Sequence, residues 1–359
     1  MASTAPARRT TDVPESLLAV GARAEARIAE LLDREATRWA EVDPALAEPI
    51  EALRTLVLSG GKRLRPAFCE WAFVGAGGEP ASPVAVDAGA ALELLHTFAL
   101  VHDDVMDGSG LRRGMSAIHR QFITRHDAAA WRGEARRFGE GVAILVGDFA
   151  FVYADVLFSD VPATARWVFD ELRLELCVGQ YLDLVGTASA SGDLSLAERI
   201  ERYKSGKYTV ERPLHLGAAL AGRFGELHAP LSAIGLPLGQ AFQLRDDLLG
   251  VFGDSVITGK PVGDDLREGK LTPLLAFATA RARGADARLL ERIGASDLSD
   301  DEVRRMQTML VDCGACDQSE ATIEQLVGES LGAIDAAPIT AEARRALREL
   351  ATYVAWRDR

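Results

Sequence analysis

The chain has 359 residues, of which 48% are hydrophobic and 26% are charged, and its formal net charge at pH 7 is -13. This much apolar sequence excludes disorder for most of the chain, and the acidic balance excludes nucleic acid or an anionic membrane as the main partner, because both would be repelled. We therefore expect a soluble, cytoplasmic protein that binds anions only through local basic pockets.

We expect the start of the chain to be a loose tail rather than a signal peptide. Residues 1–15 are rich in Ala, Ser, Thr and Pro and lack the apolar core of a signal peptide, so they predict a disordered tail before a single domain over residues 16–359. The most apolar stretch, residues 84–101, contains charged side chains and does not predict a membrane span.

The four cysteines, Cys69, Cys177, Cys313 and Cys316, are too few and too scattered for a disulfide framework. Cys313-x-x-Cys316 could be half of a zinc site or a redox pair, but no second pair or nearby histidine completes it. The alternative is two small residues at a turn between helices.

Apolar residues repeat at three- and four-residue spacing through most of the chain, which predicts helices. The predicted helices cover residues 17–42, 85–107, 141–157, 163–185, 196–221, 231–250, 273–283, 299–310 and 341–356. Loops are expected at the Gly-, Pro-, Ser- and Asp-rich segments 75–83, 187–192 and 253–269. Because strand-forming runs are nearly absent, we predict an all-α bundle of about ten or more helices.

An acidic cluster, Asp103-Asp104-Val105-Met106-Asp107, ends the second predicted helix. Residues four apart share a helix face, so Asp103 and Asp107 can bind the same divalent ions. Carboxylates with water suit Mg²⁺, which usually also binds a substrate phosphate. The alternative is a solvated helix end, common in an acidic protein.

A second acidic cluster contains Asp246 and Asp247, at the end of another apolar helix, with Asp254 just beyond. Crowded carboxylates at a helix C-terminus repel one another unless cations bind there. Two such helix ends predict two walls of one metal site, as in other helical bundles.

Basic residues gather beside glycines or beside these acidic clusters. They are Lys62, Arg63 and Arg65 in a Gly-initiated helix start, Arg112 and Arg113 after the first cluster, Lys204 and Lys207 in mid-chain, and Lys260 and Lys270 after the second cluster. Each group alone could be a solvated patch. Together with the carboxylates and Mg²⁺, they predict a pocket for diphosphates.

These segments resemble the polyprenyl synthetase family, the trans isoprenyl diphosphate synthases, from about Leu17 onward. The matching motifs occur in the family's order: GGKRLRP at 60–66, DDVMD and then RRG within 103–114, GDF at 147–149, GQYLDL at 179–184, KSGKYT at 204–209 and FQLRDDLLGVFGD at 242–254. The resemblance implies the isoprenoid synthase helical bundle around a central cavity, usually as a homodimer. It also implies a Mg²⁺-dependent, head-to-tail prenyltransferase that condenses isopentenyl diphosphate with dimethylallyl, geranyl or farnesyl diphosphate.

The resemblance assigns roles to individual residues. Isopentenyl diphosphate would be bound by Lys62, Arg65, His96 and Arg113, and the allylic diphosphate by Arg112, Lys204, Ser205, Gln243, Lys260 and Lys270. About three Mg²⁺ ions bridging the allylic diphosphate would be held by Asp103, Asp107 and Asp246, with Asp104 and Asp247 supporting them. The catalytic set would be Asp103, Asp104, Asp107, Arg112, Lys204, Gln243, Asp246 and Lys260.

Two positions depart from the family pattern. Gly250 stands where many members have a third aspartate of the second motif, from which we expect reduced metal redundancy rather than loss of activity. Ser205 replaces the commoner threonine and keeps the hydroxyl. Neither departure changes the assignment.

The expected chemistry is ionisation of the allylic carbon–oxygen bond, attack by the double bond of isopentenyl diphosphate, and loss of a proton to the released diphosphate. Product length should be set by Ala99 and Phe98, four and five residues before Asp103, one turn along the same helix. A small residue at the position nearer to Asp103 and an aromatic residue at the farther one resemble the pattern of twenty-carbon synthases. We therefore predict geranylgeranyl diphosphate as the main product. Farnesyl diphosphate or a somewhat longer product is the alternative, and core packing is the alternative role of Phe98.

Three rival functions remain to be weighed. A class I terpene cyclase shares the ionisation chemistry but needs no second diphosphate site, which the basic helix start and Arg113 supply. An HD-type phosphohydrolase would use His102 and Asp103 but lacks an upstream histidine pair. A non-catalytic subunit of a heteromeric synthase is disfavoured by the intact acidic motif, Arg112 and Gln243.

Overall fold

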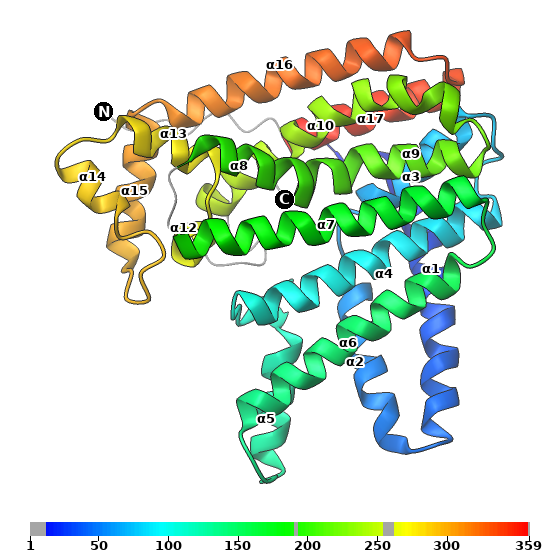
Figure 1. The fold of residues 1–359 in the computed structure, drawn as a ribbon, viewed down its shortest axis with the longest axis horizontal. Helices are drawn as coiled ribbons and strands as arrows, with labels where there is room; N and C mark the ends of the chain where they lie inside the picture. Colours follow the sequence, from blue (N-terminus) through cyan, green and yellow to red (C-terminus); the bar gives the residue numbers. More distant parts are fainter. Residues whose placement is uncertain (1–11, 190–192, 254–261, 358–359) are drawn as a thin grey trace.

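The computed structural model describes residues 12–189, 193–253 and 262–357, and these form a helical bundle (Figure 1). Its elements are α1 Glu15–Ala40, η1 Pro44–Leu46, α2 Ala47–Leu58, α3 Leu64–Gly75, α4 Pro83–Met106, β1 Leu111–Arg112, β2 Met115–Ser116, α5 Ile118–Ala128, α6 Ala135–Leu157, α7 Ala163–Ser189, α8 Leu194–Ile200, η2 Glu201–Glu211, α9 Arg212–Leu220, α10 Phe224–Phe252, α12 Asp264–Glu268, α13 Pro273–Arg281, α14 Ala285–Leu290, α15 Asp300–Asp312, α16 Ala315–Ala336 and α17 Ala341–Trp356. The predicted all-α fold is confirmed. Most of the predicted tail, residues 1–11, lies outside the described residues.

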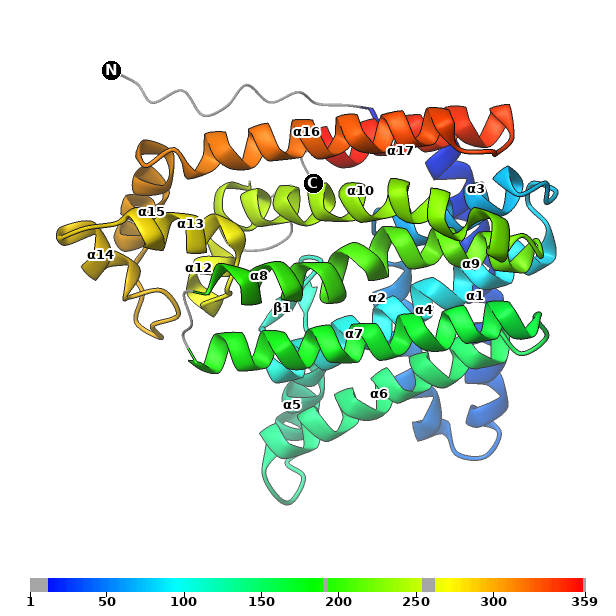
Figure 2. The same ribbon diagram turned by 45° about the horizontal axis from the view of Figure 1, so that its top comes forward.

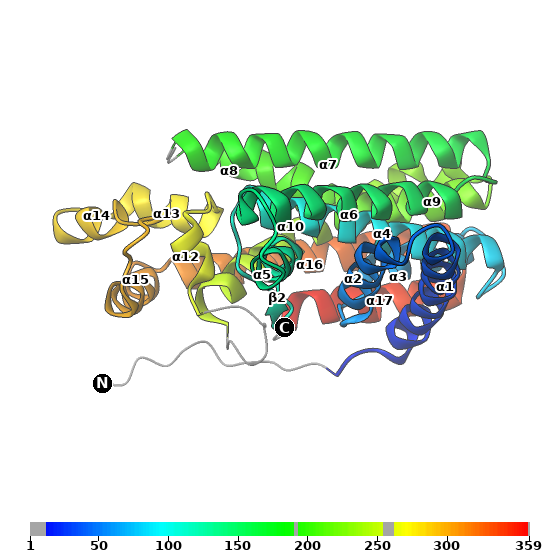
Figure 3. The same ribbon diagram turned by 90° about the horizontal axis from the view of Figure 1, so that it is seen from below.

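The long helices are stacked in layers. Figure 2 shows α16 and α17 along one side, α10 beside them, and α7 and α6 along the opposite side. Seen from below, α7 lies along one edge of the bundle, whereas α1 and α17 lie toward the other edge (Figure 3). Two apolar clusters fill the interior, one around α3, α10, α16 and α17 and one around α1, α4, α6 and α7.

The central helix α4 is almost wholly apolar until its last turn. Among the described residues it is the one helix long and apolar enough to span a membrane, with a mean hydropathy of 1.6. However, 61% of that apolar window is buried inside the protein, as expected of a core helix. The burial positions α4 so that its acidic C-terminal turn emerges at the end of the bundle.

Several helix starts follow from capping residues that the sequence displays. Ser299 and Glu302 form a reciprocal capping box at the start of α15, and Thr340 caps α17 through the Ala343 amide. Thr272 caps α13, whose first residue is a proline. These caps satisfy backbone amides that have no partner within the helix.

The structure corrects the expected helix boundaries in three regions. The helix expected over residues 196–221 is divided into α8, the π-helical segment η2 and α9. The segment 253–269, expected to be a loop, contains the short helix α12, and α7 extends into the segment expected to be a loop at 187–192. Helices α2, α5, α12, α14 and α16 were not predicted, and for α3 only the basic helix start was predicted, not its extent.

Candidate active site

The first acidic cluster lies where α4 leaves the core. Asp103 Oδ1 accepts a hydrogen bond of 2.8 Å from Gln180 Nε2 on α7 and lies 3.1 Å from Lys204 Nζ on η2. The neighbouring Asp104 is buried and accepts a 2.8 Å hydrogen bond from Arg112 Nε. Arg112 also lies 3.9 Å from Asp103, so the two adjacent carboxylates share one cation while Asp103 has Lys204 as a second.

The two carboxylates that share a helix face differ in their electrostatics. Burial opposes ionisation of Asp103, but the surrounding cations, Lys204 foremost, outweigh it and lower its pKa to about 2. Partial burial and the charge of Asp103 raise the pKa of Asp107 to about 6. A second negative charge on this face is therefore disfavoured unless a further cation approaches.

A two-residue hairpin places the two arginines that follow this cluster. β1 and β2 are antiparallel, and the turn residues Arg113 and Gly114 have φ values of 52° and 74°, as the tight primed turn requires. The turn separates Arg112, which binds Asp104, from Arg113, whose Nη1 donates 2.9 Å to the Leu56 carbonyl at the end of α2. The two neighbouring arginines thus contact different helices, α4 and α2.

The second acidic cluster ends α10 and has its own cations. Asp246 Oδ1 lies 3.3 Å from Lys62 Nζ and accepts a 2.6 Å hydrogen bond from Arg357 Nη2. These two cations lower the pKa of Asp246 to about 2 despite its burial. Burial, the charge of Arg357 and the nearby cations in turn lower the pKa of Lys62 to about 8. The adjacent Asp247 accepts a 2.7 Å hydrogen bond from Gln243.

The basic helix start is fixed by a residue in the left-handed conformation. Arg63 has a φ of 51° directly before α3, and its side chain is 4% exposed. Its guanidinium reaches Glu25 on α1 at 2.8 Å and Glu93 on α4 at 2.5 Å. Since Arg63 is tied to two helices, the flanking Lys62 and Arg65 project from a rigid turn.

Arg65, at the start of α3, lies among other basic side chains. Arg65 Nη2 donates a 2.8 Å hydrogen bond to Thr209, and its guanidinium lies 4.4 Å from the Tyr208 ring centroid. His96 is half-buried, and burial together with Arg65 and Arg113 lowers its pKa well below the usual value. Excess positive charge without a paired carboxylate is an electrostatic environment suited to an anion.

Glycines allow the segments around Asp103 to approach one another. A Cβ on Gly179 of α7 would overlap the Lys204 backbone, with Cα only 2.6 Å away, and a Cβ on Gly147 of α6 would overlap the His102 ring. At Gly179 the obstructing atoms are backbone, so a larger residue would separate α7 from η2, whereas at Gly147 the His102 ring would have to move. Gly179 therefore allows the close approach of α7 and η2 beside Lys204.

The loop after the first cluster contacts the segment after the second. Ser109 Oγ donates a 2.9 Å hydrogen bond to Glu268 on α12, and Lys270 Nζ lies 2.7 Å from the other oxygen of that carboxylate. Lys270 also contributes to holding the pKa of Asp103 low. The segments that follow the two acidic helix ends are thus in contact with each other.

Not every predicted site residue is brought into this network. Lys260 and Asp254 lie outside the described residues, and Ser205 is partly buried on η2 and its side chain makes no hydrogen bond within the described part of the chain. Phe98 and Ala99 lie on α4, where the Phe98 ring is 5.0 Å from Phe151 and 4.6 Å from His102. The Phe98 ring therefore packs against two aromatic rings near Asp103.

The carboxylates fit magnesium in type, although within the described ranges no three His, Cys, Asp or Glu side chains form a ready metal-binding group. Magnesium usually takes one or two carboxylates and completes its shell with water and phosphate, so a three-carboxylate cage is not required. One oxygen of buried Asp247 has no hydrogen-bond partner among the described residues, which is an unmet need that a cation would satisfy.

Sequence reasoning missed three groups that act on the acidic residues. Asp183 accepts from Lys204 at 2.6 Å, Gln180 donates to Asp103, and Arg357 binds Asp246. The first two belong to the GQYLDL motif, which was noted for its resemblance but given no role. Arg357 carried no local signal, because it lies 111 residues from its partner.

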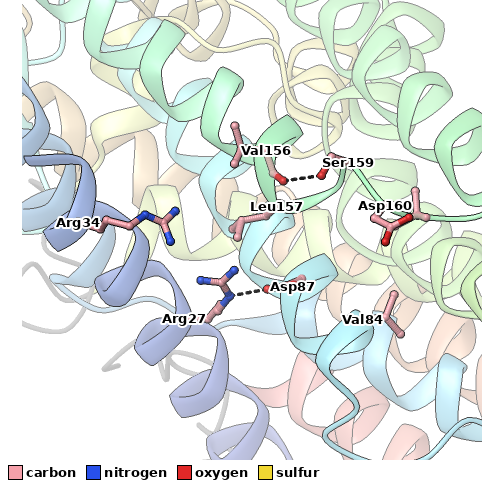
Figure 4. A pocket seen from close by; sticks show the side chains of 9 residues that line it. Arg27, Arg34, Val84, Asp87, Val156, Leu157, Ser159 and Asp160 are labelled. Atoms are coloured by element: carbon pink, nitrogen blue, oxygen red, sulfur yellow. Dashed lines mark hydrogen bonds and ion pairs between the residues drawn. The ribbon is translucent and has the colours of Figure 1, made fainter. Parts of the chain in front are cut away.

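Other features of the surface lie apart from these residues. A pocket of about 350 Å³ opens between α1, α4 and the α6–α7 connection, and its lining includes the 2.5 Å ion pair of Arg27 and Asp87 (Figure 4). None of the predicted site residues lines it. His102 faces the Ile144 carbonyl on α6 at 3.0 Å, while Asp103 faces η2, so these two side chains do not act as an HD metal pair.

Comparison with known proteins agrees with this geometry. The family described as Polyprenyl synthetase matches residues 47–310. Geranylfarnesyl diphosphate synthase of Aeropyrum pernix is 31% identical over 312 residues, covering 83% of this chain and 91% of that protein. Geranylgeranyl diphosphate synthase of Methanosarcina mazei is 32% identical over 303 residues, covering 80% and 86%.

Solved structures are similar over nearly the whole fold. Geranylgeranyl pyrophosphate synthase from Corynebacterium glutamicum, solved with isoprenyl diphosphate and magnesium, superposes with a TM-score of 0.89 at 36% identity. The match covers 97% of this chain and 100% of that one. Since the family match, the curated relatives and the fold agree over most of the sequence, this chain belongs to the polyprenyl synthetase family of trans prenyltransferases.

Proposed function

We propose that this protein is a Mg²⁺-dependent prenyl diphosphate synthase that joins isopentenyl diphosphate to allylic diphosphates and makes mainly geranylgeranyl diphosphate. The observation that carries the proposal is the presence of two separate sets of cations at one site. One set, Arg112 and Lys204, surrounds the end of α4, and the other, around Lys62 and Arg65, lies beside the α2–α3 turn. A condensing enzyme must hold two diphosphates at once, whereas a cyclase holds one.

The subsite for isopentenyl diphosphate would be formed by Lys62, Arg65, His96 and Arg113. The Arg65 Nε and the His96 Nδ1 are buried without partners among the described residues, so both can serve an incoming phosphate. Burial and the neighbouring guanidinium groups of Arg63 and Arg112 lower the pKa of Arg113 to about 10, which a bound anion would reverse. These groups would hold the diphosphate and orient the double bond toward the allylic carbon.

The allylic subsite would be formed by Arg112, Lys204, Ser205, Gln243, Lys260 and Lys270. The Lys204 ammonium group binds both Asp103 and Asp183, and it would also bind the diphosphate oxygens when the substrate is present. Mg²⁺ held by Asp103 and Asp107 on α4 and by Asp246 and Asp247 on α10 would supply further positive charge that stabilises the departing diphosphate.

The remaining groups of the chain would govern the fate of the allylic cation. When the carbon–oxygen bond breaks, Arg112 and Lys204 stabilise the charge that develops on the leaving diphosphate. The apolar surface of Phe98 and Phe151 keeps water from the cation while the new carbon–carbon bond forms. The diphosphate, held by the same cations, then accepts the proton whose loss restores the alkene.

We also propose that the protein is a homodimer. Helix α7 exposes an apolar stripe of Leu174, Val178, Tyr181 and Val185 at helical spacing, and Tyr181 is 67% exposed. Light scattering should give twice the mass of one chain, and Val178→Arg should reduce it to the monomer. Leu18→Arg, at an equally exposed position on α1, is the control and should remain dimeric.

One assay tests the catalytic proposal. The purified chain is incubated with labelled isopentenyl diphosphate, each allylic starter and Mg²⁺, and the products are separated by chain length. A twenty-carbon product is expected. A cyclic hydrocarbon would favour the cyclase, and activity that requires an added second protein would favour the non-catalytic subunit.

A further inference from the structure

The π-helical segment η2 carries residues that contact both proposed subsites. Lys204 Nζ lies 3.1 Å from Asp103 beside the allylic subsite, and Thr209 accepts a 2.8 Å hydrogen bond from Arg65 of the other subsite. The winding of η2 therefore fixes the direction of both side chains at once. Because π-helical winding is rare and mostly limited to a single turn, a segment of 11 residues needs contacts that hold it.

One carboxylate binds two cations of this segment and its end. Glu175 on α7 accepts hydrogen bonds of 2.6 and 2.7 Å from Nε and Nη2 of Arg212, and it also accepts a hydrogen bond from Lys207 Nζ. The three side chains are only 10–13% exposed. Charge-assisted hydrogen bonds that are shielded from solvent and bidentate are among the strong ones in proteins.

The spacing of the two cations suits the π-helical winding. Lys207 and Arg212 are five residues apart, and the Arg212 amide donates to the Lys207 carbonyl, which is the backbone bond of a π-helix. In an α-helix, residues five apart point in directions that differ by about 140°, because each residue turns by about 100°. When a π-helical bond joins the two residues, their side chains lie close together, so both can reach the same carboxylate.

The rest of the same face of α7 follows η2. Glu175, Gly179 and Asp183 are four residues apart and therefore share this face. A Cβ on Gly179 would overlap the Lys204 backbone, and Asp183 accepts a 2.6 Å hydrogen bond from Lys204 Nζ. This face thus binds η2 at Lys204 through Asp183 and again, further along η2, through Glu175.

We propose that Glu175 is a positioning residue, which binds Lys207 and Arg212 together and so holds η2 in the winding that places Lys204 and Thr209 at the two diphosphate subsites. The inference rests on the proposed function. Without this carboxylate the two neighbouring cations would repel each other, and that repulsion favours a winding that separates them. Glu175 therefore acts on both substrates through η2.

The first test separates the KM values from kcat. Glu175→Gln keeps the shape of the side chain but removes its charge, and it should raise the KM for isopentenyl diphosphate and for the allylic substrate by about fivefold or more. A loss of folded protein alone would lower the apparent kcat and leave both KM values unchanged. Asp170→Asn is the matched control, because Arg173, which binds Asp170, lies on α7 itself. Its KM values should match those of the wild type.

A double-mutant cycle tests whether Glu175 acts through Lys204. When Lys204 is already alanine, Glu175→Gln should lower the allylic kcat/KM by at most about twofold further, since the side chain that it positions is absent. Effects that multiply instead would overturn the inference. If Glu175→Gln does not fold, Lys207→Met takes its place in both tests, because it retains the bonds between Glu175 and Arg212 and should also raise both KM values.

Hydrogen exchange followed by mass spectrometry supplies a measurement that does not depend on turnover. Peptides covering residues 204–212 should exchange about tenfold faster in Glu175→Gln than in the wild type or Asp170→Asn, whereas peptides from α10 should exchange at the wild-type rate. If the wild type does not condense the diphosphates, the proposed function is wrong, and the exchange rates alone test the role of Glu175. If the wild type condenses them but Glu175→Gln has wild-type KM values or wild-type exchange in η2, the inference is refuted and the proposed function stands.

Discussion

Asp103 is charged throughout the neutral range, because the charges of Lys204, Lys270 and Arg112 outweigh its burial and lower its pKa to about 2. Replacing it with alanine leaves Lys204 with Asp183 alone and removes a ligand from the ions that stabilise the leaving group. We expect Asp103→Ala to lower turnover at least about a hundredfold. Steady-state assays at saturating substrate measure this.

Two controls accompany that measurement. Asp301→Ala removes an exposed carboxylate paired only with Arg304 in the described structure, and its turnover should match the wild type. Chelation should abolish wild-type activity, and added Mg²⁺ should restore it. Near-normal turnover in a folded Asp103→Ala protein would refute the metal assignment.

A substitution of Lys62 should affect only one of the two substrates. Lys62→Ala should raise the KM for isopentenyl diphosphate by about tenfold and change the allylic KM little, because a charge-assisted hydrogen bond to one diphosphate is lost. Lys204→Ala is the paired comparison and should act on the allylic substrate. The opposite pattern would mean that the two subsites are exchanged.

The pH dependence of activity is a second test of the role of Lys62. Its pKa of about 8 means that the ammonium group is charged below this pH and loses its proton above it. The kcat/KM for isopentenyl diphosphate should therefore fall as the pH rises above about 8.

At the residue level, sequence could predict which groups carry charge but not all of their partners. Asp103 and Asp246 could be predicted because each ends an apolar helix pattern. The contact between Asp246 and Arg357 could not, since it depends on α17 packing along α10 and α3 and no spacing within one helix records it.

Helix α4 is a core element, and we propose that it also sets product length. Ala99 is a small residue one turn before Asp103, and the adjacent Phe98 packs on Phe151. Phe98→Ala should lengthen the product, and Ala99→Phe should shorten it to fifteen carbons. Chromatography of the products measures both changes. If both variants gave the wild-type distribution of chain lengths, neither Phe98 nor Ala99 would limit product length.

The contact between α7 and η2 depends on Gly179. In Gly179→Ala the added methyl group would overlap the Lys204 backbone, so the two segments must separate. We expect the free energy of unfolding to fall by about 1–3 kcal/mol and turnover to fall with it. Gly332→Ala, in α16 with nothing within 4 Å, should instead be neutral or stabilise by up to about 1 kcal/mol. Equal unfolding curves for the two variants would contradict this.

At the level of elements, prediction succeeded where helices have one apolar face. Helix α1 buries Leu17, Val20 and Ile28 at regular spacing and was predicted nearly to its ends. Most of α3 is buried, so it shows no polar face, and α16 buries Ser319 and Ser330 among its apolar residues, which weakens the periodic signal. The π-helical register of η2 was not predicted, because a search for 3.6-residue periods does not detect it.

The stability of the whole molecule should depend on the protonation of His215. This side chain is fully buried, with Ser232 3.0 Å away and the His228 ring stacked at 4.5 Å. Burial, followed by the charges of His228 and Arg212, lowers its pKa to about 3. Lys207 adds to this effect, and Glu211 faces the same group through Ser232.

The sign of the pH effect follows from the two states. An unfolded chain binds a proton at His215 below about pH 6.5, whereas the folded chain does not until about pH 3, so acid favours unfolding. Between pH 6.5 and pH 5 the loss should be about 2 kcal/mol. Urea unfolding at fixed protein concentration measures it, and His215→Gln should show a smaller difference between these pH values. Equal differences would refute this role of His215.

The architecture of the whole molecule could be predicted from what the sequence lacks as much as from what it contains. The scarcity of β-branched runs excluded a sheet, and apolar periodicity predicted the bundle. The layering of α10 between η2 and α16 could not be derived, because it depends on close backbone approaches such as Gly206 against Gly239. Such approaches are fixed by the absence of side chains, which periodicity does not record.

The π-helical turn of η2 bears on how this chain could change by insertion and deletion. The Arg212 amide bonds back to the Lys207 carbonyl, one residue further than in an α-helix, and Pro213 follows with no amide to continue the ladder. Deleting one residue between Lys204 and Pro213 would let the segment wind as an ordinary helix while rotating Lys204 by about 100° away from Asp103. In a codon-deletion library, η2 should therefore yield proteins that accumulate normally in cells but have lost activity.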